Sequence, residues 1–81
     1  MASPEIVQLK VELTALESRV TGERLRAENL RDTLRHHLPP LKPVEEVDAE
    51  LIFSLATDFT LAHAALKKTL GEIKAIKGYL E

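Results

Sequence analysis

The sequence predicts an all-α protein, an antiparallel two-helix hairpin that is coiled-coil-like and dimerises into a four-helix bundle. Three observations predict this fold: two long segments whose apolar residues recur in alternating steps of three and four, a proline-rich corner between them, and a charge order that favours antiparallel packing. The 81 residues are expected to form one helical-hairpin domain. The first helix is expected over about 4–37, the corner over 38–43 and the second helix over about 44–80.

Composition limits the class of protein. The chain has no cysteine, which excludes a disulfide and a thiolate metal site, and only 4% of its residues are aromatic although 44% are hydrophobic. The core must therefore consist mainly of Leu, Ile, Val and Ala, as in helical bundles. The N-terminal segment lacks the order of a secretion signal, and no 18-residue stretch is free of charge. We therefore expect a soluble, cytoplasmic protein with no membrane span and no cofactor.

The first helix has a predicted beginning and end. Ser3 can cap it, Pro4 suits the first helical position, and Glu5 favours the positive end of the helix dipole. Pro39 disfavours a helical conformation for the residue before it, so the helix should end near His37. Between these ends, apolar residues at heptad spacing predict a seam along one face. These seam residues are Ile6, Leu9, Leu13, Leu16, Val20, Ala27, Leu30 and Leu34.

The second helix is expected to begin directly after the corner. Pro43 can restart the helical backbone, and Glu45 and Glu46 would then lie in the first turn, where the dipole favours acidic residues. Steps of three and four follow again and predict a second seam. Its residues are Ile52, Leu55, Phe59, Ala62, Leu66, Thr69, Ile73, Ile76 and Leu80.

Folding the chain about Leu41 predicts which seam residues face each other. In this register Val20 faces Ala62 and Glu23 faces Phe59, so that every seam position meets another seam position. Two heptad seams can face each other in several registers that differ by seven residues. The register about Leu41 is the one that places the bend at the prolines. Charge favours the antiparallel arrangement, because each helix begins acidic and ends basic.

The second helix carries more apolar residues than one seam can bury. A helix that is apolar over most of its circumference is covered from more than one side, and a chain this short needs a partner to complete its core. We therefore expect self-association, most simply of two hairpins in a four-helix bundle, while a different partner protein would fit the same face. The predicted interface residues are Leu51, Phe53, Ala56, Leu61, Ala65, Leu70 and Tyr79.

No pattern in the sequence predicts catalysis. There is no glycine-rich phosphate loop and no nucleophile beside a base. Asp32 and His36 lie one helical turn apart, but a zinc site needs at least three ligands, and His63 is expected about 25 Å from the corner. Glu23 is the one charge within a seam, and we interpret it as a polar layer that fixes the register at a cost in stability rather than as a proton-handling group. We therefore expect no catalytic, cofactor or metal site.

The expected function is that of a non-enzymatic protein–protein interaction module, a small oligomeric adaptor, assembly or scaffolding protein. The alternative is a small nucleic-acid-binding regulator, which would be similar in architecture to the plasmid regulator Rop, a bundle of paired helical hairpins that binds RNA. The alternative is disfavoured, because the net charge is −2 and acidic residues are interspersed among the arginines of the first helix. The arginines concerned are Arg19, Arg24, Arg26, Arg31 and Arg35.

Overall fold

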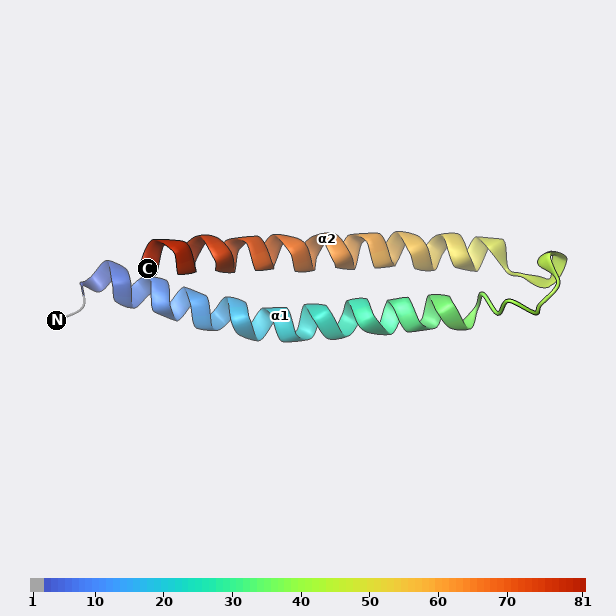
Figure 1. Ribbon diagram of the computed structural model, residues 1–81, viewed down its shortest axis with the longest axis horizontal. Helices are drawn as coiled ribbons and strands as arrows, with labels where there is room; N and C mark the ends of the chain where they lie inside the picture. The colour runs from blue at the N-terminus through green and yellow to red at the C-terminus, as the bar shows by residue number, and fades with distance from the viewer. Residues whose placement is uncertain (1–2) are drawn as a thin grey trace.

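Two long antiparallel helices make up most of residues 3–81, the part of the chain that the computed structural model describes (Figure 1). Helix α1 spans Pro4–His36, helix α2 spans Ala49–Leu80, and a short 3-10 turn, η1, spans Val44–Glu46. The helices lie side by side and pack against each other, and no strand occurs within residues 3–81. The predicted all-α, two-helix hairpin is confirmed.

The capping of α1 follows local sequence signals. The Ser3 side-chain oxygen accepts a hydrogen bond from the Ile6 backbone amide at 3.2 Å, and Pro4 is the first helical residue. This bond satisfies one of the amides that the first turn of a helix leaves without a partner. At its other end α1 stops at His36, within one residue of the end expected from Pro39.

Helix α2 begins five residues later than expected. A helical turn does begin after Pro43, but it is only the short turn η1, which contains Glu45 and Glu46. Asp48 then caps α2, because its side chain accepts a hydrogen bond from the Leu51 amide at 3.0 Å. Aspartate is favoured at this position and disfavoured inside a helix, so it terminates the short turn and starts a new helix.

Burial follows the predicted seams residue by residue. In both helices the buried and half-buried residues occupy the predicted heptad positions, and every other position is exposed except Ala56 and Glu72, which are half-buried. Because only one seam is closed, the core is thin. Its most deeply buried residues are Val20, Ala27, Ala62, Thr69 and Ile73.

The predicted register is wrong by one heptad. Arg19 forms an ion pair with Glu72 at 3.3 Å, and Glu17 approaches Lys77 at 3.9 Å, whereas the predicted register places His63 opposite Arg19. Compared with folding about Leu41, both ion pairs bring residues one heptad later in α2 to the same level of α1. The connection is also longer than expected, since it covers residues 37–48 instead of 38–43.

A shift of seven residues keeps every seam position opposite another seam position. It places Val20 across from Thr69 and Ala27 across from Ala62, which are four of the five buried residues. The first turns of α1 consequently extend beyond the C-terminal end of α2 (Figure 1).

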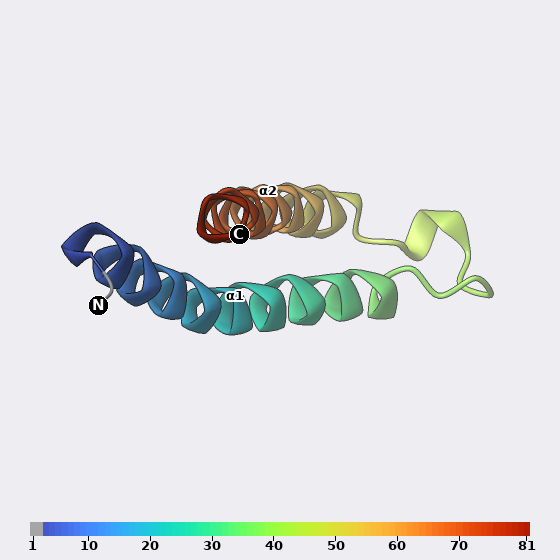
Figure 2. The same ribbon diagram turned by 60° about the vertical axis from the view of Figure 1, so that its left-hand side comes forward.

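The hairpin is a rod of 65 × 16 × 14 Å. In a second view, α1 is gently curved and the two helix axes are inclined to one another (Figure 2), as expected for helices that pack ridges into grooves. The rod therefore has two broad sides and two outer helix faces on which a partner could bind.

Candidate interaction surfaces

The seam separates the two broad sides of the hairpin, and one ion pair between the helices marks each side. Arg19 and Glu72 mark the first side, and Glu17 and Lys77 mark the second. Positions 17 and 19 lie on opposite flanks of the α1 seam, because two steps along an α-helix turn about 200°. Every other exposed residue is assigned to one of the two sides by its heptad position relative to the seam.

Three surface grooves follow the side marked by Arg19 and Glu72, which we call the grooved side. The largest, with a volume of about 620 Å³, lies at the open end of the hairpin, where Leu9, Ile76 and Tyr79 line it. A groove of about 530 Å³ surrounds the ion pair, and one of about 410 Å³ follows α1 beside Gly22. The charged residues of this side are Glu5, Glu12, Arg19, Arg26, Asp58, Lys68 and Glu72.

The opposite side holds seven of the 11 lysines and arginines, and we call it the basic side. Glu17, Glu28 and Glu81 lie among them. Asp32 lies at the edge of this side, where it pairs with Arg31 at 3.0 Å. The grooved side has three basic and four acidic residues, so charge is unevenly divided between the two sides. The basic residues of the basic side are Lys10, Arg24, Arg31 and Arg35 of α1 and Lys67, Lys74 and Lys77 of α2.

The predicted interface residues do not form one patch. Ala56 is half-buried within the hairpin, and the other six are exposed, with Phe53 reaching 75% exposure. A second hairpin packed on one broad side therefore covers only part of the predicted set. Their positions on α2 are Leu51, Leu61, Ala65 and Tyr79 on the grooved side, and Phe53, Ala56 and Leu70 on the basic side.

The five arginines of α1 are divided in the same way. Arg19 and Arg26 belong to the grooved side, and Arg24, Arg31 and Arg35 belong to the basic side. A single arginine face on α1 is therefore not formed. Three lysines of α2 complete the basic side, and the sequence alone did not group them with these arginines. Their heptad positions relative to the seam were the signal that would have grouped them with Arg24, Arg31 and Arg35.

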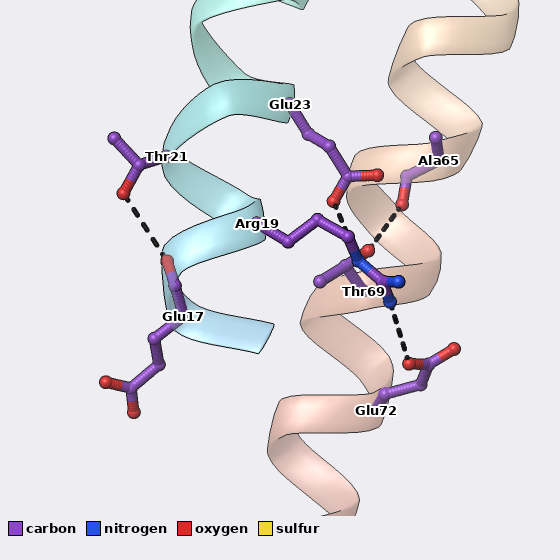
Figure 3. A network of polar contacts seen from close by, with 7 residues as sticks. All are labelled: Glu17, Arg19, Thr21, Glu23, Ala65, Thr69 and Glu72. Carbon is purple, nitrogen blue, oxygen red and sulfur yellow. Dashed lines mark hydrogen bonds and ion pairs between the residues drawn. The ribbon is translucent and has the colours of Figure 1, made fainter. Parts of the chain in front are cut away.

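Glu23 is the charged member of the seam, and it does not face Phe59 as predicted. Its carboxylate lies against the turn of α2 that contains Ala65 and Thr69 (Figure 3). The side chain is 22% exposed, and Glu23 Oε1 is buried without a hydrogen bond. Its nearest cationic group is Arg19 Nε at 3.9 Å, too far for a hydrogen bond. The Thr69 hydroxyl does not help, because it donates to the Ala65 carbonyl oxygen at 3.1 Å.

The histidines lie at two separate places. The rings of His36 and His37 meet edge to face at the end of α1, with centroids 5.6 Å apart, and the His63 ring is 5.8 Å from the Phe59 ring on α2. Within residues 3–81, no group of three or more His, Asp or Glu side chains is close enough to hold a metal ion.

Comparison with known proteins does not place the chain in a family. No family model, curated protein or solved structure matches it. Helix α2 is long and apolar enough, by length and composition alone, to cross a membrane. Core helices of soluble proteins meet the same criterion, so the criterion does not set the location of this protein.

Proposed function

We propose that the protein acts by binding rather than by catalysis, as a small helical assembly module in which a second copy covers the grooved side. The accessible surface carries this proposal. It measures 6401 Å², whereas a compact monomer of 9.0 kDa exposes about 4,800 Å². The excess is larger than the roughly 800 Å² that each partner buries in a stable interface. A second hairpin would remove this excess from water.

Charge favours the grooved side over the basic side as the contact between copies. Two basic sides would repel each other, whereas the grooved side is nearly neutral. Along α1 the grooved side begins with Glu5 and Glu12 and continues with Arg19 and Arg26, so two copies that run in opposite directions place unlike charges together. This contact would also cover Leu51 and the groove beside Tyr79.

Two leucines of α2 provide a matched test. Leu51 is 37% exposed on the grooved side, and Leu70 is 38% exposed on the basic side. We expect Leu51→Glu to dissociate the dimer, because it places a charge in an apolar contact, and Leu70→Glu to leave the dimer intact. Light scattering after gel filtration measures the mass of each variant, and circular dichroism checks that each remains helical.

Two results would contradict the proposal at different levels. Dissociation by Leu70→Glu but not by Leu51→Glu would show that the copies meet through the basic side. A wild-type chain that is well folded and monomeric at micromolar concentration would contradict self-association itself.

A further inference from the structure

We infer that the basic side binds the phosphate backbone of double-stranded nucleic acid. The inference depends on the uneven charge of the two sides of the paired helices. A chain with a net charge of −2 places seven basic and four acidic residues on this side, with Asp32 and Glu81 counted among the acidic ones. A clustered basic surface of this kind is the electrostatic feature that phosphate binding requires.

The basic residues are spread along the whole side and come from both helices. From Lys10 to Arg35, α1 rises about 37 Å, which is close to the roughly 34–36 Å of one turn of a DNA duplex. Lys67 and Lys74 of α2 lie alongside the middle and the open end of this row in the observed register. Basic side chains on the two antiparallel helices can therefore reach phosphates over one duplex turn.

The acidic residues of this side cancel only part of its charge. Glu17 lies 3.9 Å from Lys77, and Asp32 lies 3.0 Å from Arg31, so each is compensated by a neighbour. The other two are Glu28 and Glu81. The remaining basic residues form no ion pair within residues 3–81, and all are exposed; they are Lys10, Arg24, Arg35, Lys67 and Lys74.

The distribution of apolar residues favours nucleic acid over an anionic membrane. A helix that lies on a membrane needs a large apolar face between its lysines. Here the large apolar side chains exposed on the basic side, Val7, Phe53 and Leu70, lie at separate points along the rod with charged residues between them, so they form no continuous apolar face. Because aromatic residues for stacking are scarce, we expect contacts with phosphates and little preference for base sequence.

The test compares two charge reversals that change the net charge equally. Arg24→Glu with Lys74→Glu alters the basic side, and Arg26→Glu with Lys68→Glu alters the grooved side, with one substitution in each helix in both cases. The probe is a fluorescent duplex of about two helical turns, as DNA and as RNA, followed by anisotropy between about 50 and 200 mM salt. Both pairs are made in the wild-type chain and in the Leu51→Glu chain. The two charge reversals can then be compared in chains of the same oligomeric state.

We expect the wild-type affinity to fall steeply with salt, and the basic-side pair to weaken binding by about tenfold or more at low salt. The grooved-side pair should weaken it by less than about twofold to threefold. Equal weakening by both pairs would overturn the inference, because general attraction would then explain the binding. Absence of binding at about 50 mM salt would also overturn it. So would binding to phosphatidylserine vesicles without binding to either duplex, which would indicate a membrane surface.

Discussion

Glu23 is a single charged residue within a seam that is otherwise apolar. Its carboxylate lies beside Ala65 and Thr69, which are small enough to leave it room and partial access to solvent. In the register predicted from the sequence it would lie against the aromatic ring of Phe59. In the observed register it lies opposite Leu66, and one of its oxygens is buried without a hydrogen bond, so the carboxylate is costly to desolvate in either register.

This environment predicts that Glu23→Leu stabilises the hairpin. The substitution removes a buried oxygen that has no hydrogen bond and adds an apolar side chain to the seam. We expect the free energy of unfolding to rise by about 1–2 kcal/mol, measured by urea denaturation. Glu28→Leu, at an exposed position of the same helix, is the control and should change it by less than about 0.5 kcal/mol. A strongly destabilised Glu23→Leu chain would mean that the carboxylate has a structural role that its contacts do not show.

At the scale of the helix, short local signals decide where α2 begins. Pro43 and the acidic residues after it resemble a helix start, and they do form one turn. Asp48 interrupts this turn because its side chain competes for a backbone amide. The first turn that packs on α1 is therefore set by Asp48, and this also lengthens the corner.

The two possible starts of α2 predict opposite effects of Asp48→Ala. If Asp48 caps α2, the substitution removes the hydrogen bond to the Leu51 amide and should destabilise the protein by about 0.5–2 kcal/mol. If the helix instead continued from Pro43, alanine would be the better helix former at an internal position and would stabilise it. Thermal unfolding distinguishes the two signs. Glu46→Ala serves as the control, because no side-chain hydrogen bond caps η1.

At the scale of the whole molecule, the pairing of α1 with α2 decides which residues share a surface. Acidic and basic residues are mixed along the chain, and the basic side exists only because residues on two antiparallel helices are brought together. The same pairing distributes the predicted interface residues over both sides of α2. The antiparallel pairing therefore determines which residues share a surface, and the register determines which of them lie level with each other along the rod.

Cysteine pairs can test the register, because the chain has no cysteine of its own. Val20→Cys combined with Thr69→Cys should form a disulfide readily under mild oxidation, since these positions face each other across the seam. Val20→Cys combined with Ala62→Cys should form one slowly, because a shift of seven residues separates the positions by about 10 Å along the helix. Non-reducing gels and mass spectrometry measure the rates. Faster closure of the second pair would support the register predicted from the sequence.

The sequence by itself determined the two helices, their seam residues and the cap at Ser3. These features depend on heptad periodicity and on side chains within one turn, which are local properties. Only the tertiary structure decided the register and the surroundings of Glu23. Heptad patterns match again after every seven residues, so periodicity alone cannot choose among registers. A shift of seven residues leaves each residue on its own side of the seam, so the charge of the two sides follows from heptad positions, whereas the residues that lie level with each other follow from the observed packing.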